Sequence, residues 1–307
     1  MWYFSEKELL DCPSHNDGIP LDKVDVYRFK GCELIEKLAA VFRLPKLCVA
    51  SAKVFFHRYV ITCEYLFFAL HSFKKYDAWL IAVTCLFLAA KVEEHYVKAV
   101  DLSKHYLAQR KKLCHESKAS DAVHPKMPVK PHTVESQTEE LLFTECIVLH
   151  VLAYDLGVIH PYAYVNEFVQ LGLACLDSGD DVAVTLKRGA WSFLNDSSNT
   201  WLCLRFEPRV IAAAAVYLAG CYAALWTPSL DETTASLWSR ANMPVAVLAD
   251  AAKTLLDTYN KGYSYKKLPL PEGILKLLVA HGQCNLEKQH HRTTDGDVGT
   301  AIDASSG

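Results

Sequence analysis

The 307-residue sequence lacks a surplus of charge of either sign. Its 32 Lys and Arg side chains are nearly balanced by 35 Asp and Glu, which gives a formal net charge of -3. Phosphate backbones are bound by proteins with clustered positive charge, so this balance argues against nucleic acid as the main partner. With 51% of its residues apolar and 22% charged, the chain can bury a large core, which excludes wholesale disorder.

Long uninterrupted apolar runs are also missing. The most apolar stretches, about 54–73 and 79–92, are interrupted by or bordered with charged side chains, whereas a membrane-spanning helix needs roughly 20 apolar residues. The opening Met1–Glu8 has neither the basic start nor the apolar stretch of a signal peptide. We therefore expect a soluble protein of a reducing compartment, with no membrane contact.

The eleven cysteines form no Cys-x-x-Cys pair, and most lie inside apolar stretches, so we interpret them as small buried side chains. The sequence also contains only 13 Gly and 12 Pro, too few for many hairpins, and alternating β-branched runs are nearly absent. Apolar residues recur instead at helical spacing, for example from Leu34 to Phe42. These patterns predict an all-α fold.

Two segments, 79–90 and 210–225, are apolar on every side, and a helix without a polar face must be enclosed by other helices. Their sequences are alike, which indicates an internal duplication about a bundle hub. Asp77 is a candidate cap of the first hub, and Pro208 suits the first turn of the second. The remaining helices are predicted at 27–43, 48–70, 97–112, 137–154, 161–174, 182–198, 233–241 and 244–260.

Four local signals predict where elements begin and end. Ser136 and Glu139 have capping-box spacing, and Gly262 follows the last periodic stretch as a stop signal. The Lys-, Pro- and His-rich stretch 110–132 is predicted as a loop, and the polar residues beyond 265 as a flexible tail.

Charged residues at the end of the first hub form the most informative cluster. Lys91 and Glu94 stand where the enclosed helix ends, and Glu145 lies on an otherwise apolar segment, 141–152. The cluster is either a solvated helix end or a protein interface on a rigid helix. A lone acid in apolar surroundings requires a partner, so Glu145 is expected to have one.

Several blocks resemble one family in the right order: Phe56-His-Arg-Tyr59, Cys85–Glu94, Tyr154-Asp-Leu156 with His160-Pro-Tyr162, and Ala190–Ser197 with Phe206–Ala212. They are similar to the cyclin box family, nearest to the transcriptional cyclins of the K, T and L types, and the second-box stretch is most similar to cyclin K. The resemblance covers about residues 2–262. It implies two tandem five-helix boxes, at 27–157 and 158–264, between an N-terminal segment, 1–26, and a flexible tail, 265–307.

The resemblance implies a function as well. A cyclin is a non-catalytic subunit that binds a cyclin-dependent kinase and activates it allosterically. In this branch the kinase acts in the nucleus in transcription elongation, on the C-terminal tail of RNA polymerase II. No cofactor or metal is implied, and the weak His281-x-x-Cys284, His290 and His291 pattern fits no closed zinc site.

The family pattern also assigns a kinase-binding site. Lys91 and Glu145 match the family's charged pair that contacts the kinase. Around the pair, the apolar contacts match Val92, Leu149, Tyr154 and Leu156, and Glu94 belongs to the same block. Phe56 is expected in the core and Arg58 as an internal tie.

Two alternatives remain open at this point. One is a general transcription factor with a cyclin fold that binds promoter DNA, which the net acidity and the intact Lys91-Val-Glu-Glu94 block oppose. The other is a cyclin-like scaffold without a kinase, suggested by extra residues at 59–70. Neither alternative supplies catalytic groups, because we find no phosphate loop, nucleophile elbow or paired-carboxylate motif.

Overall fold

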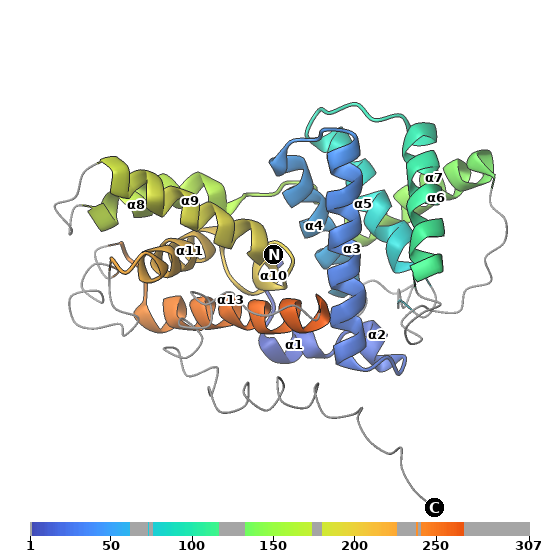
Figure 1. Ribbon diagram of the computed structural model, residues 1–307. Coiled ribbons are helices and arrows are strands. Elements are labelled where there is room, and N and C mark those ends of the chain that lie inside the picture. The colour runs from blue at the N-terminus through green and yellow to red at the C-terminus, as the bar shows by residue number, and fades with distance from the viewer. Residues whose placement is uncertain are drawn as a thin grey trace, which may run out of the picture.

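The computed structural model describes residues 2–61, 73, 76–116, 133–173, 180–225, 238 and 241–266 (Figure 1). All regular elements in these ranges are helices, which confirms the predicted all-α class. The N-terminal part contains α1 (Glu6–Leu10) and α2 (Pro13–Asn16). The first half continues with α3 (Leu21–Val41), α4 (Lys46–Ile61), α5 (Ala78–Val92), α6 (Ala99–Glu116) and α7 (Val134–Val151).

The second half begins with the 3-10 helix η3 (Pro161–Tyr164). It continues with α8 (Val165–Leu173), α9 (Asp180–Ser197), α10 (Leu202–Arg205), α11 (Pro208–Tyr222) and α13 (Val245–Lys266). In Figure 1, α8, α9 and α11 lie on one side of the molecule and α3 to α7 on the other, while α13 extends from the second half toward α3; the two halves have separate apolar cores.

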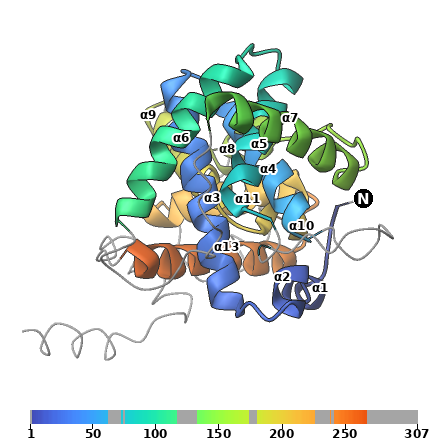
Figure 2. The same ribbon diagram turned by 90° about the vertical axis from the view of Figure 1, so that its right-hand side faces the viewer.

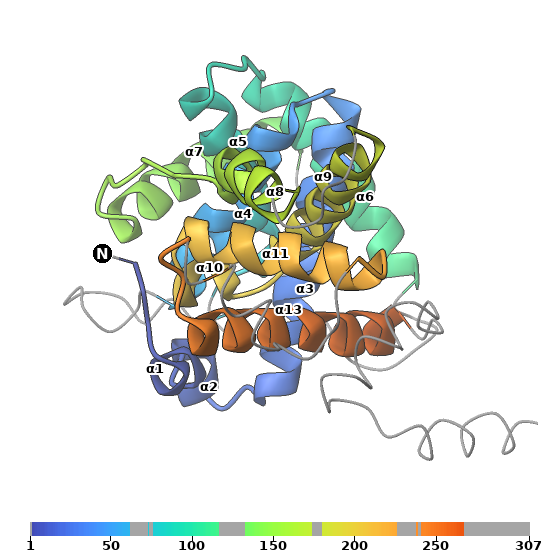
Figure 3. The same cartoon turned by 90° about the vertical axis from the view of Figure 1, so that its left-hand side faces the viewer.

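The two predicted hubs are confirmed. Every residue of α5 from Ala78 to Ala90 is buried, and α5 packs against α3, α4 and α7 (Figure 2). In the second half every residue of α11 from Ile211 to Cys221 is buried, and α11 lies between α9 and α13 (Figure 3). Asp77 caps α5 by accepting a hydrogen bond from the backbone N–H of Trp79 at 2.9 Å, and Pro208 occupies the first turn of α11.

Each half contains a close helix contact at a glycine. A Cβ atom added to Gly31 of α3 would lie 2.5 Å from the Phe56 ring of α4. One added to Gly189 of α9 would lie 2.9 Å from Cβ of Ala219 in α11. Both distances are too short for real carbon atoms, so these helices approach as they do because glycine stands at the contact.

Several predicted helix boundaries were wrong. The first long helix begins at Leu21 rather than near 27, directly after Pro20, which is tolerated at a helix start because no intrahelical N–H is needed there. Thr133, not Ser136, caps α7, and its side chain accepts from the Ser136 backbone N–H at 3.2 Å. The helix predicted to stop at Gly262 continues to Lys266, and α6 extends to Glu116, into the predicted loop.

Other expectations fall outside the described residues. These are the extra segment beyond Ile61, the remainder of the predicted loop from 117, most of the predicted helix at 233–241, and the tail beyond 266 with its His and Cys residues.

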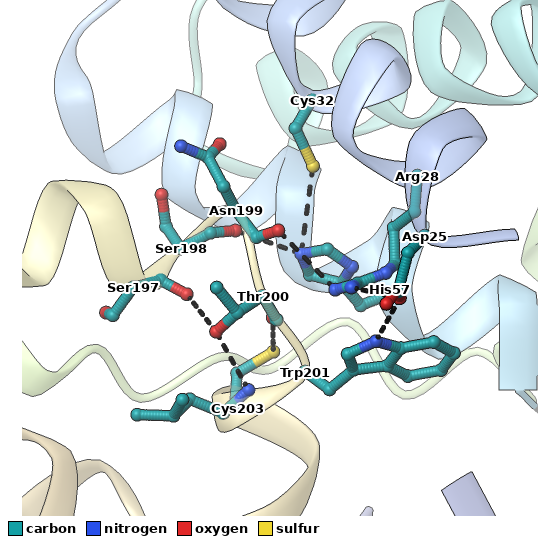
Figure 4. A network of polar contacts seen from close by, with 11 residues as sticks. Asp25, Arg28, Cys32, His57, Ser197, Ser198, Asn199, Thr200, Trp201 and Cys203 are labelled. Carbon is teal, nitrogen blue, oxygen red and sulfur yellow. Dashed lines mark hydrogen bonds and ion pairs between the residues drawn. The ribbon is translucent and has the colours of Figure 1, made fainter. Parts of the chain in front are cut away.

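A polar junction joins the two halves (Figure 4). Three side chains of the first half contact the turn after α9: the Lys53 ammonium donates to Ser198 Oγ at 3.0 Å, the His57 ring Nε2 to Ser198 O at 2.9 Å, and Arg28 to Asn199 O at 3.4 Å. Arg28 also lies over the Trp201 ring, 4.2 Å from its centroid. Since Lys53 and His57 are almost fully buried, these directional bonds set how the halves meet.

The pH dependence of unfolding tests the neutral state of His57. Burial, with a smaller contribution from the Arg28 charge, lowers the pKa of His57 from 6.5 to about 3. The unfolded chain therefore binds a proton below about pH 6.5 that the folded chain does not accept until about pH 3, so stability falls as the pH drops through this window. His57→Gln keeps a side-chain donor but does not titrate. Urea unfolding between about pH 5 and 6.5 should show the variant losing less stability than the wild type, by up to about 1.4 kcal/mol per pH unit. Equal slopes would contradict the assignment.

Candidate functional site

Lys91 stands at the end of the first hub. Because α5 is enclosed up to Ala90, its last turn is held rigidly and the Lys91 side chain emerges from the core half exposed. The ammonium lies over the Phe87 ring, 4.2 Å from the centroid, and near the negative end of the helix dipole. Its position is therefore set by the core and by a local cation–π contact.

Glu145 approaches Lys91 from α7, which packs against α5. The Lys91 ammonium donates to both carboxylate oxygens of Glu145 at 2.8 Å. The Glu145 side chain is 10% exposed and that of Lys91 is 51% exposed. Glu145, which lies in apolar surroundings, therefore has Lys91 as its partner. The pair stands at the boundary between the core and the solvent.

The turn after α5 is fixed on both sides. Glu93 caps the helix, and the His95 N–H donates to Ala90 O at 2.7 Å. Between them, Glu94 has a left-handed backbone with φ of 58° and an exposed side chain. The Ser51 hydroxyl donates to the Glu93 carboxylate at 2.6 Å.

Ser51 links this turn to the segment that enters the second half. Its oxygen lies 2.8 Å from Nε2 of His160. Burial lowers the pKa of His160, while the Glu93 carboxylate opposes this shift. Neutral His160 with a proton on Nε2 can donate to the Ser51 oxygen while Ser51 donates to Glu93. The charged block is therefore connected by hydrogen bonds to the entry of the second half.

The other predicted contacts flank the ion pair in the chain. Val92 follows Lys91 directly, Leu149 lies one turn beyond Glu145, and Leu156 lies in the loop after α7; all three are partly buried against the first core. Tyr154 in the same loop is 66% exposed, with a left-handed φ of 57°. The structure thus brings Lys91 and Glu145 into contact and places the other predicted residues on the adjoining segments.

Sequence reasoning missed part of the apolar surface on α7. Leu142 and Phe143 are exposed, at 43% and 69%, and lie within one turn of Glu145. Helical spacing could have found Leu142, because it stands three residues before Glu145 and therefore shares its face. Cys146, expected to be buried, is exposed because it follows Glu145 on the outer side of α7, whereas Cys12, Cys32, Cys48, Cys85 and Cys221 are buried as predicted.

Two further features of the described residues bear on other functions. They contain no group of three or more His, Cys, Asp and Glu side chains arranged to hold a metal ion. No described helix combines the length and the apolar character that crossing a membrane requires.

Comparison with known proteins identifies the class. Residues 1–157, half of the chain, match the family described as Cyclin, N-terminal domain. The chain belongs to the cyclin family.

Among similar relatives, Cyclin pch1 of Schizosaccharomyces pombe is 35% identical over 225 residues, 71% of this chain and 57% of the relative. Cyclin-T1-5 of Arabidopsis thaliana is 31% identical over 275 residues, 89% of this chain and 42% of the relative. Cyclin-K of Danio rerio is 30% identical over 275 residues, which are 88% of this chain and 57% of the relative. The relatives are transcriptional cyclins, and the chain spans about half their length.

Solved structures share the fold. A chain of the yeast RNA Pol II CTD kinase CTDK-1 complex superimposes with a TM-score of 0.62 at 14% identity, over 99% of this chain and 86% of that chain. A chain of the CAK complex from Chaetomium thermophilum bound to ATP-gamma-S gives a TM-score of 0.59 at 15% identity, over 99% of this chain and 95% of that chain. At these identities the likeness establishes the cyclin fold.

The stability of single and double variants tests the ion pair in the isolated chain. Lys91→Ala leaves the mostly buried Glu145 carboxylate without its cation, and we expect a loss of about 1 kcal/mol, since solvent screening at Lys91 limits the effect. Adding Glu145→Gln removes the unpaired charge and should restore most of that loss in urea unfolding. A double variant less stable than Lys91→Ala would show that the pair does not act as described.

Proposed function

We propose that this chain is the non-catalytic regulatory subunit of a cyclin-dependent kinase. It binds the kinase through the surface around Lys91 and Glu145 and holds the kinase's mobile regulatory helix in the active position. The observation that carries the proposal is the Lys91–Glu145 pair, presented by an enclosed helix at 2.8 Å. Membership of the cyclin family supports it.

The Lys91–Glu145 ion pair is already formed in the chain, so it can form hydrogen bonds to a partner without rearranging. An ammonium has three donors, and two of those of Lys91 point to Glu145, which leaves a third donor and free carboxylate lone pairs for backbone groups of a docking helix. The rigid α5 and α7 hold both side chains, so little conformational entropy is lost on binding. This arrangement suits a central contact of a protein interface.

Apolar side chains on α7 and in the loop after it provide the rest of the contact. Leu142 is exposed and Leu149 partly exposed on the face of α7 that carries Glu145, and Tyr154 is exposed after the helix ends. Apolar and aromatic groups around a polar centre exclude water when a partner docks, which strengthens the enclosed hydrogen bonds. A kinase helix seated here would keep the kinase's own Lys–Glu pair in place for phosphoryl transfer.

The similarity to cyclins of the K and T types supports a role in transcription elongation. One solved structure of similar fold is described as an RNA Pol II CTD kinase complex. We accordingly propose the repetitive tail of RNA polymerase II as the substrate of the complex and the nucleus as its location. The kinase provides all catalytic groups and binds ATP, and this chain has no cofactor of its own.

Recovery of a kinase from extract tests the proposal. The tagged chain is incubated with extract of its own cells, bound kinases are identified by mass spectrometry, and activity is measured on a polymerase-tail peptide. We expect one cyclin-dependent kinase in stoichiometric amount, active only with this chain. Lys91→Ala with Glu145→Ala should weaken binding by about 30-fold or more, the effect of removing an interface hot spot.

A matched control pair lies in the second half. Arg209 donates to Glu167 at 2.6 Å and lies over the Phe168 ring at 5.2 Å, so the pair reproduces the local chemistry of Lys91, Glu145 and Phe87. Arg209→Ala with Glu167→Ala should bind and activate the kinase as the wild type does. Wild-type activation by the Lys91/Glu145 variant would overturn the site. Recovery of DNA or other proteins without a kinase would overturn the function.

A further inference from the structure

The N-terminal segment Trp2–Phe4 joins the two halves of the molecule. At one end the Phe4 N–H donates to Leu204 O in α10 of the second half at 2.8 Å. Phe4 also packs against a small buried cluster of Leu9, Ile61 and Leu204, which belong to α1, α4 and α10. Phe4 is therefore anchored where the two halves meet.

At that other end, Trp2 holds a single residue of the loop after α7. The indole N–H of Trp2 donates to a carboxylate oxygen of Asp155 at 2.7 Å. The Arg58 guanidinium lies over the Trp2 ring, 4.8 Å from its centroid, and donates to Asp155 O at 3.0 Å. Both the side chain and the backbone of Asp155 are thus bound from outside the loop.

Asp155 stands between Tyr154 and Leu156, two of the residues assigned to the kinase contact. The loop begins with two consecutive left-handed residues, Ala153 with φ of 49° and Tyr154 with φ of 57°. Side chains with a Cβ atom disfavour this conformation, so it persists where surrounding contacts hold it. The end of α7 supplies some of these contacts, since the Tyr154 N–H donates to Leu149 O at 3.0 Å.

A cleft borders the segment that directly follows the loop. It has a volume of about 230 Å³ and is lined by Gly157, Val158 and His160 of that segment and by Trp2 and Arg58, among others. Dense packing therefore does not enclose the chain just after Leu156, so the loop can shift when a tethering bond is lost.

We propose that Trp2 is a positioning residue that holds the loop 154–156 in the kinase-binding conformation, so that the N-terminal segment sets the affinity for the kinase. This proposal rests on the proposed function. Trp2 acts through Asp155 and has no role in the phosphoryl transfer itself. Its loss should weaken assembly and leave the turnover of the assembled complex unchanged.

Trp2→Phe tests the proposal, because it keeps a ring for Arg58 and removes the indole N–H. The first readout needs no kinase: the amides of Tyr154 and Asp155 donate within the chain at 3.0 and 2.9 Å, so their hydrogen exchange reports opening of the loop. We expect exchange at least about fivefold faster. The second readout uses the kinase recovered with the wild-type chain, whose Kd should rise about tenfold with kcat unchanged at saturation.

Trp191→Phe is the matched control, since it makes the same chemical change at an exposed tryptophan on α9. It should alter neither readout. Asp155→Asn keeps an oxygen acceptor for the indole and should restore most of the affinity lost in Asp155→Ala. If Trp2 and Asp155 act as a pair, Trp2→Phe with Asp155→Ala will bind the kinase as Asp155→Ala alone does.

The outcomes separate this proposal from the proposed function. Faster exchange with unchanged kinase affinity overturns the positioning role and leaves the kinase-binding function standing. Unchanged exchange, or additive effects of the two substitutions, also overturns it. A wild-type chain that binds no kinase overturns both, and the Lys91/Glu145 experiment then fails as well.

Discussion

The complete burial of α5 is the constraint on which the rest of the first half depends. All residues from Ala78 to Ala90 are enclosed, so the helix is stable only while α3, α4 and α7 surround it. Such a helix cannot bind a partner along its length and can present functional groups only at its ends. Asp77 caps the N-terminal end of α5, and Lys91 projects from its C-terminal end. The ion pair with Glu145 is placed accurately because a packed core, rather than a loop, carries its lysine.

Apolar burial stabilises each half, but polar bonds determine how the halves meet. The buried Lys53 and His57 donate to the turn at Ser198, and the N-terminal segment is bound to Leu204 at one end and to Asp155 at the other. Hydrogen bonds are directional, and a buried donor without an acceptor is costly, so sliding one half over the other would break several bonds at once. The surface assigned to the kinase is therefore supported from the second half as well as from its own core.

The parts that the sequence predicted follow from local chemistry. Continuous apolar character identified both hubs, and the isolation of Glu145 on an apolar segment required a partner, which is Lys91. Helix ends were less predictable, because Thr133 and Ser136 are both good caps by residue type, and the helix begins after Thr133. The junction was not predicted at all: nothing near His57 in the sequence indicates that its acceptor is Ser198 O. The same holds for Trp2 and Asp155, whose contact depends on how the N-terminal segment crosses the folded chain. The 27–157 and 158–264 boundaries and the kinase-binding roles of individual residues stay predictions.

Site-specific photo-crosslinking tests the central claim most directly. A photoreactive phenylalanine analogue replaces Tyr154, which is 66% exposed in the loop after α7, or Tyr222, which is 55% exposed at the end of α11. Each 307-residue chain is irradiated in cell extract, and covalent products are identified by mass spectrometry. The account predicts a cyclin-dependent kinase crosslinked through its regulatory helix from position 154 and no kinase product from position 222. A kinase crosslinked from position 222 and absent from position 154 would contradict it.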